Sequence, residues 1–179
     1  MPIITRRLDY NGFQAKIDRL GLSSLVTEAE TPLNSFILRV AERRHANGTR
    51  GVRQEIDFAF AALGGWTKIA SGGIDWQKSS ATGTRLGVEV QVSGRSDMLA
   101  VDIMHFKEAI NEGRIDVGLI IVPDDNLSRF LTDRTPNLKT AIKHVEDKAR
   151  DMPIRIVAFA QDGSGPALAK MRTNLGKPP

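Results

Sequence analysis

The fold is decided by a short stretch of alternating residues, Gly87-Val-Glu-Val-Gln-Val92. Successive side chains of a β-strand point to opposite faces, so the three valines share one face while Glu89 and Gln91 share the other. The pattern predicts a strand over Leu86–Val92. Its polar face is the first candidate for chemistry, and the alternative interpretation is the solvated face of an antiparallel strand.

Upstream of this strand the period of the apolar residues changes from helical to extended. The predicted helices are Phe13–Leu25, Thr31–Ala46 and Gly51–Leu63. Short strands are expected at Trp66–Ala70 and Ile74–Gln77, around the turn Ser71-Gly-Gly73. Together with Leu86–Val92 they would form three adjacent antiparallel strands.

Downstream, helices alternate with continuous apolar runs that are typical of strands buried on both faces. The expected elements are a helix over Asp97–Asn111, a strand over Asp116–Val122, a helix over Leu138–Arg150 and a strand over Ile154–Ala160. The order favours the α/β class, with an α+β-like arrangement, a mixed sheet flanked by helices and an N-terminal helical extension. We expect one domain over residues 1–179, with a helical part at 1–48, a core at 49–162 and a basic tail at 163–179.

Composition excludes several classes of function. The 179 residues contain no cysteine, so disulfide scaffolds, zinc ribbons and thiol nucleophiles are excluded. No apolar run reaches the roughly 20 residues of a membrane span and no secretory signal is present, so a cytoplasmic protein is expected, with no membrane partner. Its formal net charge of +4 and pI of about 9.6 permit a nucleic-acid partner.

A second acidic residue is expected beside the polar face of the Leu86–Val92 strand. Asp75 lies in the neighbouring predicted strand, which can bring its carboxylate next to that of Glu89. Two adjacent carboxylates repel each other unless a cation neutralises them. Hard oxygen ligands without histidine or cysteine favour Mg²⁺, so Asp75 and Glu89 are the candidate metal ligands.

Asp75 followed by Glu89-x-Gln91 resembles the site of PD-(D/E)XK nucleases in the variant Asp…Glu-x-Gln. The region from about Glu55 to Asp162, and the order of its predicted elements, resembles the BglII-type restriction endonucleases. The resemblance implies a sequence-specific type II restriction endonuclease that hydrolyses phosphodiester bonds of double-stranded DNA. It implies a Mg²⁺ ion, for which Mn²⁺ can substitute, held by Asp75 and Glu89, with Gln91 orienting the attacking water.

Gln91 departs from the usual lysine of that pattern, and a neutral amide brings neither a base nor a charge. Lys78, in the loop after the second strand, is a spare candidate for that charge. Glu55 flanks the apolar arc of its predicted helix, and the resemblance matches it to an acidic residue that contributes to the site in related nucleases. The alternative for Glu55 is a helix-rim residue paired with Arg53 or Arg50.

Several polar residues are candidates for DNA contacts. The resemblance implies base reading by the loop Thr132–Asn137, in which Arg134 and Asp133 suit one G·C pair, and by residues just after the catalytic strand. The candidates for base contacts are Ser93, Arg95, Ser96, Asp133, Arg134 and Asn137. The candidates for phosphate contacts are Arg39, Arg43, Arg44, Arg50 and Arg53. Ordinary turn chemistry and a solvated helix rim are the respective alternatives.

The resemblance also implies a partner of the same kind. A type II enzyme that cuts both strands of a palindromic site needs two active sites related by a two-fold axis, so a homodimer is expected. The two predicted N-terminal helices are candidates for its apolar surface. Two alternatives remain at this point: a defence or toxin nuclease of the same fold, and a non-catalytic DNA-binding module with a decayed site.

Overall fold

A mixed β-sheet forms the centre of the computed structural model, which describes residues 1–40, 46–69, 74–92, 95–131 and 134–163 and no side chains of 46–50. The six strands are β1 (Ile3–Asp9), β2 (Thr67–Lys68), β3 (Trp76–Ser79), β4 (Arg85–Val90), β5 (Val117–Pro123) and β6 (Ile154–Ala160). They lie in the order β1-β6-β5-β4-β3-β2. β4, β5 and β6 are parallel, and the remaining strands pair antiparallel with their neighbours.

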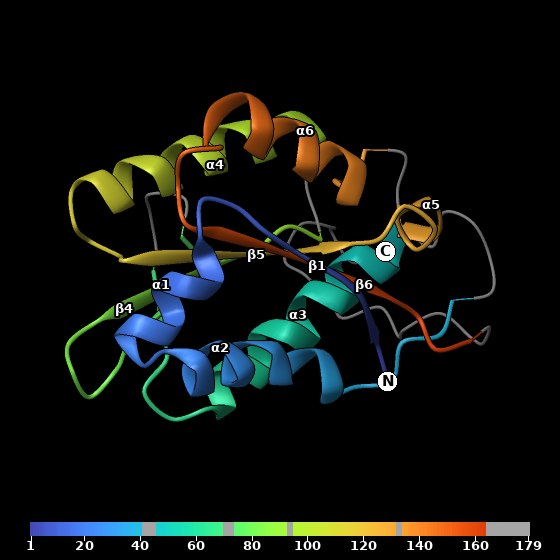
Figure 1. The fold of residues 1–179 in the computed structure, drawn as a ribbon. Helices are drawn as coiled ribbons and strands as arrows, with labels where there is room; N and C mark the ends of the chain where they lie inside the picture. Colours follow the sequence, from blue (N-terminus) through green and yellow to red (C-terminus); the bar gives the residue numbers. More distant parts are fainter. Residues whose placement is uncertain (41–45, 70–73, 93–94, 132–133, 164–179) are drawn as a thin grey trace.

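Helices cover both faces of this sheet (Figure 1). They are α1 (Phe13–Leu20), α2 (Ser23–Glu30), α3 (Ala46–Ala62), α4 (Ser96–Asn111), α5 (Ser128–Leu131) and α6 (Leu138–Lys148), with a 3₁₀ turn at Thr31–Asn34. Figure 1 shows α4 and α6 together on one face and α1, α2 and α3 on the other. Within the described ranges, no helix has the length and apolar character needed to cross a membrane.

Each face of the sheet has its own apolar core. Leu99 and Ile103 of α4 pack with Val145 of α6 against the sheet on one side. Phe60 of α3 and the valines of β4 belong to a larger cluster on the other side, and the ring of Phe60 lies between those of Trp66 and Trp76. Both faces of the parallel strands are therefore buried from solvent, which explains their continuous apolar sequences.

Two glycines allow side chains to approach the sheet closely. A Cβ atom on Gly118 would lie 2.5 Å from the ring of Phe106, and one on Gly87 would lie 2.8 Å from Ile115. No real Cβ contact is that short, so alanine at either position would displace a core side chain. Gly87 thus allows Ile115 to pack directly against the strand that carries Glu89.

The predicted mixed α/β sheet and the three adjacent antiparallel strands are confirmed. Two N-terminal predictions are wrong. The helix expected over Phe13–Leu25 is two helices, because the chain turns at Gly21, whose φ of +66° suits glycine. The helix expected over Thr31–Ala46 ends as a 3₁₀ turn, and its last residues 41–45 lie outside the described residues.

The error over Thr31–Ala46 has a clear cause. Phe36, Leu38 and Val40 are buried while Ile37 and Arg39 are exposed, which is the period of an extended chain. The backbone nitrogen of Val40 donates to Oε1 of Gln161 at 2.5 Å, beside the end of β6. Apolar residues spaced by three and four therefore satisfied a helical template while the true period was two.

Strand β1 was not anticipated. It is an edge strand with mostly exposed side chains, including Arg6, and a β-bulge between Ile4 and Arg6. Charged residues and bulges are common on edge strands because they prevent pairing with other molecules. The same features remove the alternating hydrophobic pattern by which a strand is recognised.

Candidate active site

The candidate site forms where the last residues of β4 extend past Trp76, the first residue of β3. Asp75 directly precedes β3, and its backbone nitrogen donates to the carbonyl of Val88 at 3.0 Å. The next nitrogen of β4 on this side, that of Val90, donates to Oδ2 of Asp75 at 2.8 Å. A carboxylate thus replaces the missing strand partner, which holds Asp75 beside the polar residues of β4.

Glu89 and Gln91 are buried, with only 5% and 7% of their surface exposed. Nε2 of Gln91 donates to Oε1 of Glu89 at 2.8 Å and also to Oδ2 of Asp102. The interpretation of this strand face as solvated is therefore wrong. The amide of Gln91 instead joins two carboxylates inside the protein.

Asp102, on α4, is the residue that sequence reasoning missed. It lies three residues after Leu99 and four before Phe106, both fully buried, so it stands on the face of α4 that covers the sheet. An acid in the apolar arc of the helix after the Glu-x-Gln strand was the available signal. The resulting acid cluster consists of Asp75, Glu89 and Asp102; Gln91 links Glu89 to Asp102, and Asp75 acts on both through its charge.

Crowding of these acids changes their proton affinities. Burial, and then the neighbouring carboxylates of Asp75 and Asp102, raise the pKa of Glu89 well above its ordinary value. Burial and the charge of Asp75 raise the pKa of Asp102, although His105 and the amide of Gln91 act against this shift. Excess negative charge is therefore the main electrostatic property of this side of the site.

A cation from α3 meets the acid cluster from the other side. Arg53 donates to Oδ1 of Asp75 through Nη2 and to the carbonyl of Val90 through Nη1, the latter at 2.7 Å. Its Nε donates to Asp57 at 3.1 Å. Asp57 also accepts from Nζ of Lys68 at 2.7 Å and from Nε1 of Trp76 at 2.9 Å. We call Arg53, Asp57, Lys68 and Trp76 the paired cluster, because each of its charged side chains has a partner of opposite charge.

The residues present suit a divalent ion. The carboxylate of Asp75 is held against β4 by the nitrogen of Val90 and raises the pKa of Glu89, as expected for two acids placed to share a cation. Mg²⁺ in nucleic-acid enzymes is commonly held by one or two carboxylates together with water and phosphate oxygens. In the described part of the chain, no group of three or more His, Asp or Glu side chains is arranged to hold a metal by itself.

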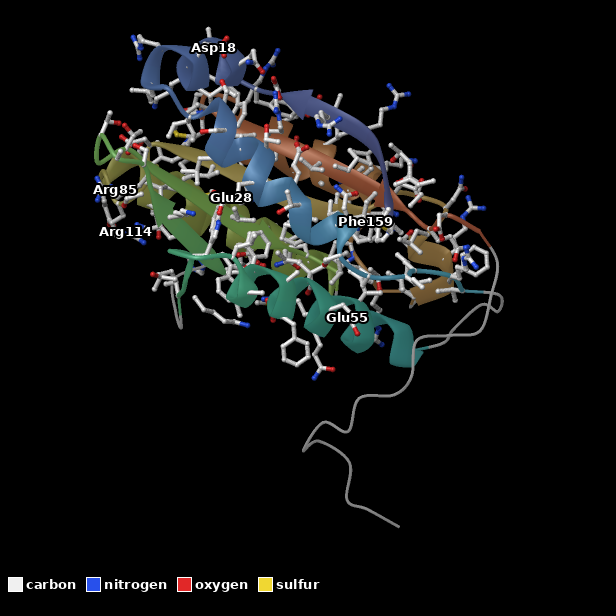
Figure 2. The ribbon with its side chains drawn as sticks, turned by 90° about the horizontal axis from the view of Figure 1, so that it is seen from below. Asp18, Glu28, Glu55, Arg85, Arg114 and Phe159 are labelled. Carbon is white, nitrogen blue, oxygen red and sulfur yellow. The ribbon has the colours of Figure 1, made fainter. Side chains whose placement is uncertain are left out.

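Other predicted site residues lie elsewhere. Glu55 lies half-buried on α3 (Figure 2), and no contact joins it to the acid cluster within the described residues. Lys78 of β3 donates to Oε1 of Glu28 of α2 at 2.7 Å, so its charge is paired away from the acids of β4. Arg53, which was assigned to a phosphate-binding stripe or to Glu55, is the residue of α3 that reaches Asp75.

The residues predicted to contact DNA are only partly described. Arg95 precedes α4, is exposed and pairs with Asp97 at 2.7 Å, and Ser96 begins the helix. Asn137 caps α6, because its Oδ1 accepts from the nitrogen of Thr140 at 3.0 Å. Arg134 lies exposed before this cap, whereas Ser93 and Asp133 lie outside the described residues.

The predicted arginine stripe is also incomplete in the structure. Arg39 is exposed and pairs with Asp162 at 3.4 Å. Arg43, Arg44 and the side chain of Arg50 lie outside the described residues.

Comparisons with known proteins agree with this geometry. The structure is similar to the crystal structure of restriction endonuclease BglII complexed with a DNA 16-mer, with a TM-score of 0.64 and 20% identity over 88% of this chain and 78% of that one. It is also similar to free BglII, with a TM-score of 0.60 and 18% identity over 88% and 79% of the chains. No curated protein matched in a sequence search. Because the family model of restriction endonuclease BglII/BglIII matches residues 19–159, the chain belongs to that family of type II restriction endonucleases, which are DNA-cleaving hydrolases.

Proposed function

We propose that the chain cuts double-stranded DNA at a specific palindromic sequence, as a homodimer, with Mg²⁺ held by Asp75 and Glu89. The observation that carries the proposal is the placement of Asp75 against β4 through the nitrogen of Val90, beside Glu89 and the buried amide of Gln91. Restriction endonucleases of this family generally use a divalent metal, and the oxygen-only donor set favours Mg²⁺, with Mn²⁺ as a substitute. Such activity would take place in the cytoplasm.

The chain's own residues divide the chemistry between them. Asp75 is fixed by the nitrogen of Val90, and Glu89 by the amide of Gln91, so both acids are oriented before any ligand arrives. Both N–H groups of Gln91 are engaged by carboxylates, so its Oε1 is the atom that would orient the attacking water. The bound metal would activate water and stabilise charge at phosphorus. Glu55 remains a more distant candidate on α3.

DNA contacts are proposed at the two segments that the sequence indicated. Arg95 is the better supported residue, because its ion pair with Asp97 is exposed and such pairs are weak enough to exchange for a base or phosphate. Ser96, the first residue of α4, and Ser93, which lies outside the described residues, are the other candidates of this segment. Arg134, Asp133 and Asn137 form the second segment, before α6. BglII has been crystallised with DNA, which supports a duplex substrate here.

The homodimer has a candidate surface on α4. Met98, Val101 and Met104 are 48%, 42% and 38% exposed, and they follow one another at intervals of three along the helix. Exposed apolar residues so arranged favour an interface with another protein. This surface is a better candidate than the N-terminal helices, whose apolar residues are largely consumed by the core.

Cleavage of duplex DNA tests the proposal. Purified protein is incubated with a long duplex DNA of known sequence in about 10 mM Mg²⁺, a concentration typical of weakly held, water-rich sites. Discrete fragments that disappear with EDTA and with Glu89→Gln are expected, and end mapping then gives the site. DNA binding without cutting in Mg²⁺ or Mn²⁺ would contradict the proposal.

A further inference from the structure

We propose that Arg53 supplies the fixed positive charge of the active site that the neutral Gln91 does not supply, and that it acts through Asp75 as a positioning residue. The proposal rests on the proposed function, since it assigns Arg53 to the site of Asp75 and Glu89. Arg53 lies outside the Asp…Glu-x-Gln pattern, on α3, which comes before β2, β3 and β4 in the chain.

Arg53 is built into the site rather than lying at the surface. Only 20% of its side chain is exposed, and its guanidinium donates in three directions, to Asp75, to the carbonyl of Val90 and to Asp57. The planar fork of arginine matches such a set of acceptors, whereas lysine would bring the same charge with fewer of these contacts. Burying a charge is costly, so its retention here requires the acids around it.

The contacts of Asp57 leave the charge of Arg53 available to Asp75. Asp57 has its own cation in Lys68, at 2.7 Å, and a neutral donor in Trp76. In the described part of the chain, the carboxylate of Asp75 accepts hydrogen bonds from the nitrogen of Val90 and from Arg53, and Arg53 is the charged donor of the two. Arg53 is therefore the cation that neutralises Asp75.

The charge count explains why the site needs this arginine. Glu89 and Asp102 accept from one amide of Gln91, and the negative charge of Asp75 acts on both, so three carboxylates contribute to the charge of the site. A divalent ion and one arginine balance three negative charges, so a phosphodiester can approach a neutral site. Without Arg53 the loaded site would carry a net negative charge and would repel the phosphate.

Substitutions of Arg53 test whether its charge matters. The variants are Arg53→Gln, Arg53→Lys and Arg53→Gln combined with Gln91→Lys, which returns a cation from β4. Arg114→Gln is the matched control, because Arg114 forms an exposed ion pair with Glu112 at 2.6 Å, remote from the acid cluster. Two quantities are measured. The first is the single-turnover rate of DNA cleavage. The second is the Mn²⁺ midpoint, which is the Mn²⁺ concentration at which the melting temperature of the DNA-free protein has risen by half of its maximal increase.

Loss of the charge is expected to slow cleavage by about 100-fold or more in Arg53→Gln, the size seen when one transition-state charge partner is removed. Arg53→Lys should cut at least about tenfold faster than Arg53→Gln, and Gln91→Lys should restore at least about tenfold to Arg53→Gln. The Mn²⁺ midpoint of Arg53→Gln should not weaken, because removing a cation does not reduce attraction for a metal.

Three results would overturn the proposal. Arg53→Gln cuts as fast as the protein with Arg53, Arg53→Lys cuts as poorly as Arg53→Gln, or Arg53→Gln weakens the Mn²⁺ midpoint, which is the result expected for a lost metal ligand. If the double variant fails to fold, the comparison of lysine with glutamine at position 53 decides. Glu89→Gln is run beside them. If Glu89→Gln cuts normally, the proposed function itself fails. If it is inactive while charge at position 53 has no effect, only the assignment of Arg53 fails.

Discussion

Two groups of charged side chains meet at the end of β4, and they differ in balance. In the paired cluster, Asp57 on α3 has Arg53, Lys68 and Trp76 as donors. In the acid cluster, carboxylates from β4 and α4 crowd around one neutral amide. The first arrangement is that of a structural ion-pair network. The second carries excess negative charge, which a bound cation would neutralise.

The pKa values express this difference. Burial acts to raise the pKa of Asp57, but the charge of Arg53 and the three hydrogen bonds outweigh it, so the pKa is lowered. At Glu89 burial and neighbouring acids act together, so the pKa is raised. The paired cluster therefore stabilises the folded state at neutral pH, whereas the acid cluster destabilises it until a cation binds.

The largest expected effect is on catalysis by the acid cluster. Glu89→Gln keeps the size of the side chain and its acceptor for Gln91, but removes the charge that the proposed mechanism uses to hold the metal. We expect cleavage to fall by about 1,000-fold or more. Glu146→Gln, at an exposed position of α6 outside the proposed dimer surface, is the matched control and should cut normally. Normal cutting by Glu89→Gln in a single-turnover assay would remove Glu89 from the mechanism.

A smaller effect is expected from breaking the paired cluster. Asp57→Asn removes a charged acceptor of three donors, and the free energy of unfolding should fall by about 1–2 kcal/mol at pH 7. Since the folded-state pKa of Asp57 is lowered, this loss should be full above its unfolded pKa of about 4 and should shrink as the pH falls below it. Urea unfolding of Asp57→Asn and of the exposed control Asp147→Asn at several pH values measures this. A difference that stays constant down to pH 3 would show that the charge of Asp57 has no role.

The smallest expected effect comes from the outer member of the acid cluster. Asp102→Asn keeps an acceptor for Nε2 of Gln91 and removes one negative charge from beside Glu89. The metal-free protein should melt a few degrees higher, at about 2–4 °C per kcal/mol of relieved repulsion. Calorimetry beside Asp147→Asn checks this, and a lower melting temperature would mean that Asp102 stabilises the fold through contacts rather than opposing it through charge.

The difference between the two clusters also shows what the sequence can predict. Asp75, Glu89 and Gln91 were found because period two and the order of strands place them together. The paired cluster was not found, because its members come from α3, β2 and β3 and only the packing of the helix on the sheet joins them. Arg53 and Asp57 are four residues apart, so a helical pair was visible, but its direction toward Asp75 was not.

The central and C-terminal elements were predicted well for a similar reason. Strands such as β5 and β6 are buried on both faces and show continuous apolar runs. The prediction of the N-terminal part was wrong because β1 is a charged edge strand, and because residues 36–40 alternate between buried and exposed although they belong to no strand. Local pattern identifies elements that are buried evenly, and it fails where the environment changes from one residue to the next.

The most direct test of the acid cluster as the metal site is the melting temperature of the protein and of Glu89→Gln at pH 7, with and without saturating Mg²⁺. In EDTA the variant should melt higher, because the raised pKa of Glu89 means that its charge opposes folding above its unfolded pKa of about 4.3. In Mg²⁺ the protein with Glu89 should gain more than the variant, because a ligand that binds only the folded state stabilises it. Equal shifts in both proteins, or a variant that melts lower in EDTA, would contradict the account.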